Sequence, residues 1–322
     1  MNGLIRLLPG EHLSAAPARW HYLGATGALE HTFAALGLNQ NSFRPHRLFS
    51  DDDLVLEKRL AHEGVVNPRY THGMAAYEQS FLRSEEQTLL RDSAIAPQIK
   101  GTHSVLPEWS RWCPDCVEYD NDTYGISYYH RDHQLPGVFH CHKHKLGLVD
   151  GCYECGFHVS TLKAQRVPPH DNICPNCGTW MSSYDGVFTQ SMADMEVATL
   201  ALMYAEPDPN RQRLSLESIR AHAGLKQENE NTMSERKLLT HWLNEFAAYY
   251  EPAEIKAYFK SPKMIKGILS SPLMRDPRLY LQDTPRSPIH PLVHLMSEQF
   301  VHQSDKRTVQ TSEVKGICTT CP

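Results

Sequence analysis

The sequence predicts a mostly α-helical protein with a small central metal-binding region. Hydrophobic residues recur at helical spacing in the first hundred residues and again after residue 186. Between these parts, cysteine, histidine, aromatic and turn residues replace the long hydrophobic patterns. We therefore expect an N-terminal helical domain of helix-turn-helix-like character at 1–100 and a domain of tandem metal-binding fingers at 101–185. A second helical domain is expected at 186–285, with a possible helix-turn-helix, followed by a proline-rich, polar C-terminal segment at 286–322.

The N-terminal domain is predicted from three helical patterns. Residues 11–23 space their hydrophobic side chains as a helix does, although Pro17 interrupts the pattern. Residues 28–38 resume it and end at Gly37. A third helix is expected at 51–60, where three aspartates suit the positive N-terminal end of a helix. We interpret these aspartates as a solvated helix start, not as a catalytic site for divalent metal.

The central region contains four pairs of metal-ligand residues, each separated by two residues. A two-residue gap lets two ligands in a tight turn reach one metal ion at tetrahedral angles. The donor atoms complete two sites, one with three thiolates and an imidazole and one with four thiolates, and both sets are typical of zinc. We predict two structural zinc ions, and the pairs are Cys113 with Cys116, Cys141 with His144, Cys152 with Cys155, and Cys174 with Cys177.

Two pairings of these motifs are open. The sequential pairing joins the first pair to the second and the third to the fourth, whereas a cross-braced pairing interleaves them. We favour the sequential order, because Cys155 and Cys174 are separated as in a zinc ribbon, by about 15–20 residues. His140 and His142 flank the motifs but are not needed as ligands. The pair Cys318–Cys321 is either half of a third site, cut off by truncation, or an idle tail.

Composition and missing motifs limit the function classes. The chain has 322 residues, a net charge of −5 and no long hydrophobic run or signal peptide, so we expect a cytoplasmic protein whose nine cysteines bind metal and do not form disulfides. Four protein ligands close each site, whereas a catalytic zinc keeps one position open. The sequence contains no P-loop and no His-Glu-x-x-His motif. We therefore predict a protein that is not an enzyme.

Contacts to DNA would require local basic surfaces, because the net charge is negative. One helix is expected at 192–204. Two more, at 214–223 and 234–250 with Gly224 in the turn between them, fit a helix-turn-helix. Its candidate contacts are Arg211, Arg213, Arg220, Lys226, Arg236, Lys237 and His241. A second set near the first metal site consists of His130, Arg131, His133, Lys143 and Lys145. The alternatives are an ordinary solvated helix face for the first set and a mini-core beside the metal for the second.

The residues between the metal ligands resemble a known family. Trp109 to Cys116, followed by Gln134-Leu135-Pro136-Gly137 and then by Cys141 and His144, is similar to the zinc region of bacterial TniQ/TnsD proteins. Leu8-Pro9-Gly10-Glu11 resembles the start of that family. The resemblance implies a transposon target-selection protein that recruits an AAA+ ATPase. TnsD-type members bind a DNA attachment site, and TniQ-type members bind a guide-RNA CRISPR effector complex.

The motif spelling and the C-terminal cysteine pair favour the TnsD-like branch, whose chains are longer. The resemblance also implies a protein of the bacterial cytoplasm, associated with the nucleoid when bound to DNA, and allows a homodimer. Two rival functions are a zinc-containing helix-turn-helix transcription regulator and a metalloenzyme. The closed metal sites argue against the second.

Overall fold

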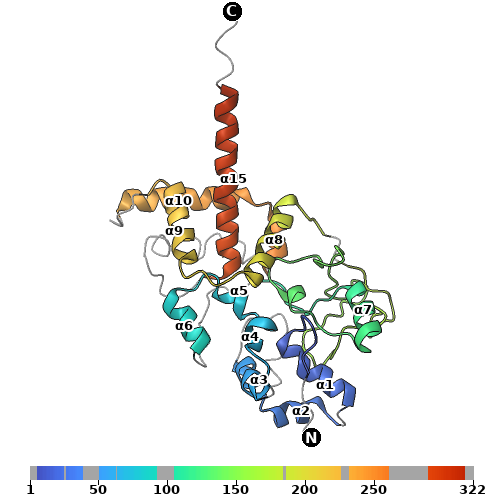
Figure 1. Cartoon of the computed structure of the whole chain (residues 1–322). Helices are drawn as coiled ribbons and strands as arrows, with labels where there is room; N and C mark the ends of the chain where they lie inside the picture. Colours follow the sequence, from blue (N-terminus) through green and yellow to red (C-terminus); the bar gives the residue numbers. More distant parts are fainter. Residues whose placement is uncertain are drawn as a thin grey trace, which may run out of the picture.

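The computed structural model describes residues 6–24, 27–38, 51–62, 64–92, 105–183, 186–225, 232–260 and 289–315. Within these ranges the regular secondary structure is helical, and extended segments pair only through isolated β-bridges. The predicted mostly helical fold class is therefore confirmed. Figure 1 shows α1 to α3 near the N-terminus, α9, α10 and α15 at the opposite end, and the loops around α7 along one side.

The N-terminal part consists of short helices. A 3₁₀ turn spans Leu13–Ala15, and the helices are α1 (Ala16–Gly24), α2 (Leu29–Leu36), α3 (Asp51–Ala61), α4 (Pro68–Thr71), α5 (Ala75–Gln79) and α6 (Ser84–Asp92). The helix expected from residue 11 begins only at Ala16, and Pro17 lies in its first turn, where a missing backbone N–H costs nothing. Glu11 instead forms a β-bridge with His130. α2 ends at Gly37, which adopts the left-handed conformation with φ 76°.

The aspartates at the start of α3 differ from the prediction. Asp52 and Asp53 are 7% and 5% exposed, so this helix start is not solvated. The hydroxyl of Ser14 donates a hydrogen bond of 2.8 Å to Asp53, which ties α3 to the 3₁₀ turn. Tertiary structure causes the burial of Asp53, because its partner Ser14 lies 39 residues away in the sequence. The side chain of Asp51 lies outside the described residues.

Three C-terminal helices agree with the predicted segments, and they are α8 (Gln190–Tyr204), α9 (Arg211–His222) and α10 (Met233–Tyr249). α11 (Pro252–Tyr258) and α15 (Pro291–Lys315) were not predicted, and α15 lies in the part that was expected to be a proline-rich, polar segment. Thr232 and Glu235 form a reciprocal capping box at the start of α10. The connection between α9 and α10 runs from Ala223 to Thr232, which is longer than the turn of about three or four residues in a helix-turn-helix.

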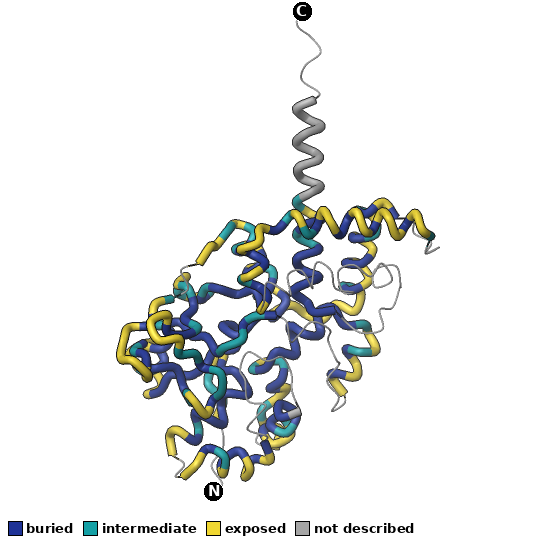
Figure 2. The backbone as a smooth tube through the Cα atoms, turned by 180° about the vertical axis from the view of Figure 1, so that it is seen from behind, coloured by how far each residue is buried: buried dark blue, intermediate teal, exposed yellow. Residues whose placement is uncertain are grey.

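Two large hydrophobic cores and a small cluster of Ala75, Leu82 and Leu90 hold the described residues together. The larger core extends from the cysteines at 113, 116 and 141 to α8, α10 and α15, and it includes the aromatic cluster of Trp242, Phe246 and Phe300. The other packs α1 to α3 against Trp112, Cys152 and Cys174. Figure 2 shows that buried backbone runs through both parts of the molecule. The cysteine-rich region therefore shares its interior with helices on both sides. The four segment boundaries stay predictions.

None of the described helices is both long enough and apolar enough to cross a membrane.

Candidate metal centres

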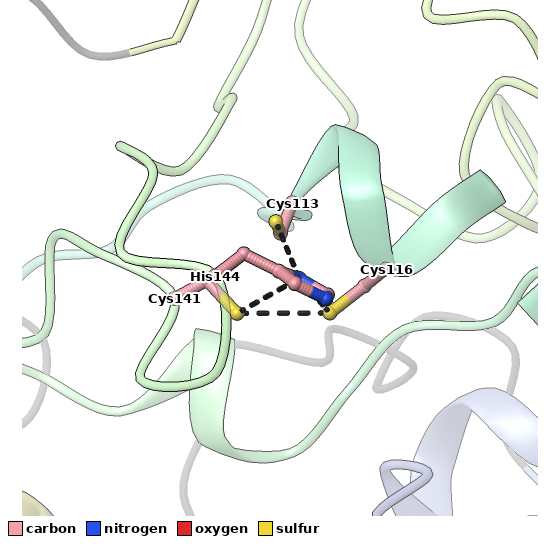
Figure 3. A group of neighbouring side chains, drawn as sticks. All are labelled: Cys113, Cys116, Cys141 and His144. Atoms are coloured by element: carbon pink, nitrogen blue, oxygen red, sulfur yellow. Dashed lines mark hydrogen bonds between the residues drawn. The ribbon is translucent and has the colours of Figure 1, made fainter. Parts of the chain in front are cut away.

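The first candidate centre lies where α7 (Pro114–Tyr124) meets a tight turn. Cys113 precedes the helix, Cys116 lies in its first turn, and Cys141 and His144 approach from the turn opposite (Figure 3). The Nδ1 atom of His144 lies 3.4 Å from the sulfurs of Cys113 and Cys116 and 3.7 Å from that of Cys141. The Cys116 and Cys141 sulfurs are 3.6 Å apart.

These distances match the edges of a zinc tetrahedron. With Zn–S bonds of about 2.3 Å and Zn–N bonds of about 2.0 Å, the edges are about 3.5 to 3.8 Å long. The four ligand atoms lie within 4.8 Å of one another, as one ion requires. The residues therefore fit a zinc ion that is held by protein atoms at all four positions.

The charge of the cluster also requires a cation. The neighbouring Cys113 and Cys141 sulfurs, together with burial, raise the pKa of the Cys116 thiol. Three thiolates this close repel one another, so a divalent ion is needed before all three ionise. With zinc bound, each sulfur becomes a thiolate ligand.

The second candidate centre consists of four cysteines in two turns. The sulfurs of Cys152 and Cys177 are 3.6 Å apart, and those of Cys155 and Cys174 are also 3.6 Å apart. A hydrogen bond with the Thr179 hydroxyl lowers the pKa of the Cys177 thiol to about 6. These residues fit a four-thiolate zinc site.

Three of the ligand turns share one backbone arrangement. The residue four positions after the first cysteine donates its N–H to the carbonyl of that cysteine, from Lys145 to Cys141, from Gly156 to Cys152 and from Gly178 to Cys174, at 2.8 to 2.9 Å. The chain leaves each turn in the left-handed conformation, with φ 60° at Lys145, 71° at Gly156 and 75° at Gly178. The glycines adopt this conformation without strain.

The structure places the eight predicted ligands in two groups of four, in the sequential order and not in the cross-braced one. His140 and His142 lie outside both groups. The Nδ1 atom of His140 donates to the Glu196 carboxylate at 3.2 Å, and His142 lies 3.7 Å from Asp132. The seven cysteines within the described residues form no disulfide. Cys318 and Cys321 lie outside those residues.

Three of the predicted DNA contacts are buried, which corrects the sequence-based interpretation. His130, Arg131 and His133 are 6%, 5% and 2% exposed. His130 contacts Asp120 at 2.8 Å, and Arg131 donates to the carbonyl of Thr71 at 2.6 Å. Burial lowers the pKa of His133 to about 4. These side chains belong to the interior beside the first centre and are not available to phosphates.

The other candidate contacts lie nearer the surface. Lys143, Lys145, Arg236 and Lys237 are exposed, and Arg220 is half-buried. Three of the rest pair with carboxylates, which are Glu298 for Arg211, Glu217 for Arg213 and Glu245 for His241. Such pairing is typical of a solvated helix face. Lys226 lies outside the described residues, and contact with DNA stays a prediction for this set.

Gln134 positions the first centre, a role that the sequence analysis did not assign. Its side chain is fully buried, accepts from the backbone N–H of Arg111 at 3.0 Å and donates to the Arg111 carbonyl at 2.7 Å. The Arg111 guanidinium in turn donates to the carbonyls of Leu135, at 2.9 Å, and Val138. These bonds clamp the two ligand-bearing segments together. The Gln-Leu-Pro-Gly motif, which contains Gln134, was the feature of the sequence that could have indicated this role.

Glu196 of α8 is a second positioning residue that was missed. Its carboxylate accepts from the backbone N–H groups of Phe139, at 2.8 Å, and His140, at 2.5 Å. It therefore holds the segment just before Cys141 against α8. A single glutamate in a helix carries no sequence signal for such a contact.

Comparison with known proteins identifies a family domain in this chain. The TniQ family model matches residues 4–148. Residues 4–148 are a TniQ family domain. The TniQ domain contains all four ligands of the first centre and ends before Cys152, the first ligand of the second. TniQ domains occur in target-selection proteins associated with transposition, and the family is a non-catalytic adaptor family. No curated protein matches the chain.

Proposed function

We propose that this protein is a target-selection adaptor in DNA transposition. The observation that carries the proposal is the TniQ domain over residues 4–148, which includes the complete first metal centre. In this role the protein binds a target, either a DNA attachment site or a guide-RNA effector complex, and recruits an AAA+ ATPase. The TnsD-like branch, which binds DNA directly, is the favoured form, on the spelling of the Gln-Leu-Pro-Gly motif.

Zinc has a structural role in this proposal. Each centre offers four strong protein ligands, and this arrangement leaves no position for substrate or water. When bound, zinc supplies a positive charge that lets the clustered thiols ionise and ties their turns together. The chain's own contribution is the clamp of Gln134, Arg111 and Glu196, which sets the ligand positions.

Recruitment of the ATPase is the decisive test. Zinc-loaded protein is mixed with the AAA+ ATPase encoded by the same transposon, in the presence of ATP and target DNA, and complexes are separated by size-exclusion chromatography. We expect co-elution. Sequence-specific protection of DNA in a footprint without any ATPase complex would instead identify a transcription regulator.

The contribution of exposed basic residues to target binding is tested by substitution. We expect Lys143→Ala with Lys145→Ala to weaken DNA binding and to lower its salt dependence, because each phosphate contact releases counterions. Lys163→Ala is the matched control, since Lys163 is exposed but pairs with Glu30 of α2. Equal loss of binding in both proteins would contradict a specific role for the 143–145 turn.

A further inference from the structure

An acidic pocket lies between α7 and the second metal centre. Its volume is about 680 Å³, and its lining includes Glu118, Asp122, Asp171, Asn172 and Trp180. Three of these are exposed carboxylates, and Trp180 is 59% exposed. The pocket is distinct from the metal centres, because none of the eight metal ligands lines it.

Negative charge dominates the pocket. Asp115, Glu118 and Asp122 follow one another at three and four residues, so they share one face of α7, and Asp171 faces them. Every lining residue is described, and none is lysine or arginine; His170 is the one basic side chain in the lining. Lys143 and Lys145 lie on the turn before Leu146, a lining residue, but do not line the pocket themselves.

This charge arrangement does not serve the stability of α7. Glu118 and Asp122 are like charges four residues apart, which destabilises an exposed helix. Asp122 also lies in the last turn of α7, where the helix dipole disfavours a negative charge. A cation placed between these carboxylates removes both penalties.

On one side of the pocket the buried Asn172 side chain is held by hydrogen bonds, and on another side the Trp180 indole is exposed. Asn172 is buried, accepts a hydrogen bond of 2.8 Å from the Trp112 indole and donates one of 2.5 Å to the Met181 carbonyl. Trp180 is held by a backbone bridge with Ile173, and its indole is largely exposed. An exposed indole beside carboxylates is a favourable surface for a guanidinium, which stacks on the ring and bonds carboxylates in a fork.

We infer that this pocket binds an arginine side chain from a basic segment of a partner protein. The four carboxylates repel phosphates, so the partner is a protein and not a nucleic acid. The inference agrees with an adaptor role but does not rest on it, because any arginine-bearing partner segment satisfies the pocket.

The test uses the zinc-loaded full chain and a fluorescein-labelled peptide, Gly-Leu-Arg-Ala-Arg-Leu-Gly, in fluorescence anisotropy. We expect binding that weakens with added salt. A peptide with citrulline in place of both arginines keeps the shape but loses the charge, and we expect it to bind at least about tenfold more weakly. Glu118→Lys with Asp122→Lys should weaken binding of the arginine peptide by a similar factor, and Trp180→Ala by about threefold to tenfold.

Glu206→Lys with Glu217→Lys is the control, because it makes the same charge change at exposed positions away from the pocket. We expect it to bind the peptide within about twofold of the unchanged protein. Zinc content and circular dichroism of each variant establish that it is folded. The inference is overturned if the arginine peptide does not bind, if the citrulline peptide binds equally well, or if both charge-reversal proteins behave alike. Random-sequence duplex DNA that competes with the peptide and needs Glu118 and Asp122 would also overturn it.

Discussion

At the scale of single residues, the Gln-Leu-Pro-Gly motif has a physical explanation. Gln134 clamps the backbone of Arg111, and Leu135 is fully buried in the larger core. Gly137 adopts a left-handed conformation with φ 85°, and a Cβ there would lie 3.1 Å from Thr199 and 3.2 Å from Leu292. The motif therefore packs the segment that precedes Cys141 against α8 and α15.

Gly137→Ala should destabilise the protein by about 1–3 kcal/mol, because alanine disfavours this conformation and meets two side chains at close range. Urea unfolding of the zinc-loaded protein measures the change. Gly24→Ala is the matched control, since its Cβ meets nothing within 4 Å and its φ is not positive. Equal stability of the two variants would show that the packing around Gly137 is looser than described.

Two buried histidines, His290 just before α15 and His294 within it, are held neutral in the larger core. Burial lowers the pKa of both His290 and His294 to about 3. The His290 ring accepts the backbone N–H of Leu292 at 3.2 Å, and the His294 ring stacks on Phe81 with ring centres 4.3 Å apart. The Arg211 guanidinium also lies over the Phe81 ring, 5.0 Å from its centre, and its positive charge further lowers the pKa of His294.

These histidines make the free energy of unfolding depend on pH. Their folded pKa values lie below the ordinary value of 6.5, so the unfolded chain binds more protons between about pH 3 and 6.5. Stability is therefore unaffected by them above pH 6.5 and falls below it, by up to about 1.4 kcal/mol per pH unit for each histidine.

We expect His294→Gln to remove the contribution of one histidine to the change of unfolding free energy with pH, even though the substitution lowers stability at neutral pH. Urea unfolding at pH 7.0 and 5.5 measures the slope, and the acid response of the metal centres is common to both proteins. His302→Gln, at an exposed position of the same helix, should keep the original slope. An unchanged slope in His294→Gln would contradict the neutral, buried state.

At the scale of elements, local patterns predicted the helices, and long-range contacts decided burial. The run of helix-favouring residues without glycine or proline in α8, the glycine that ends α2 and the spacing of the ligand pairs are all local, and each was predictable from neighbouring residues. The burial of Arg131 was not, because its partner is a carbonyl of α4, sixty residues earlier in the chain. Likewise, Asp53 is buried because Ser14 reaches it from another element.

The two metal centres differ in their exposure to solvent. Cys113, Cys116 and Cys141 are all buried, whereas Cys155 and Cys177 are exposed. A chelator or alkylating reagent reaches an exposed thiolate directly, but a buried one only after local opening. The second centre is therefore the more accessible of the two.

Zinc release should accordingly occur in two phases, with the second centre first. A chromogenic chelator measures zinc over time, and peptide mass spectrometry after brief alkylation identifies the modified thiols. We expect Cys155 and Cys177 to be labelled before Cys113 and Cys116. Cys177→Ser should abolish the fast phase and leave the slow one. Release in a single phase, or earlier labelling of Cys113, would contradict this order.

At the scale of the whole molecule, the metal centres are parts of larger cores. The sulfurs of the first centre lie in the core that extends to α10 and α15, and two sulfurs of the second lie in the core of the N-terminal helices. Trp112 lies between the centres, since it precedes Cys113 and its indole bonds Asn172, two residues before Cys174. Loss of metal at either centre should therefore disturb the packing of helices well beyond the ligand turns.

Removing zinc should unfold the cysteine-rich region and expose Trp112, which is 1% exposed in the folded protein. A structural zinc contributes an apparent ~10–16 kcal/mol, comparable to or larger than the whole stability of most domains, about 5–15 kcal/mol. We expect chelation, or Cys116→Ser, to shift tryptophan emission to longer wavelength. Trp180 contributes little to the shift, because it is already 59% exposed.

Substitution of single tryptophans assigns the emission shift to particular side chains. Trp180→Phe should keep the emission shift and Trp112→Phe should lose much of it, while Trp242, 2% exposed in the core that contains Cys116, reports whether α10 loosens as well. A shift from both tryptophans means that the larger core unfolds with the first centre, as its continuity with the cysteines implies. If elemental analysis establishes zinc removal and neither the emission nor the unfolding temperature changes, the metal does not hold this fold together.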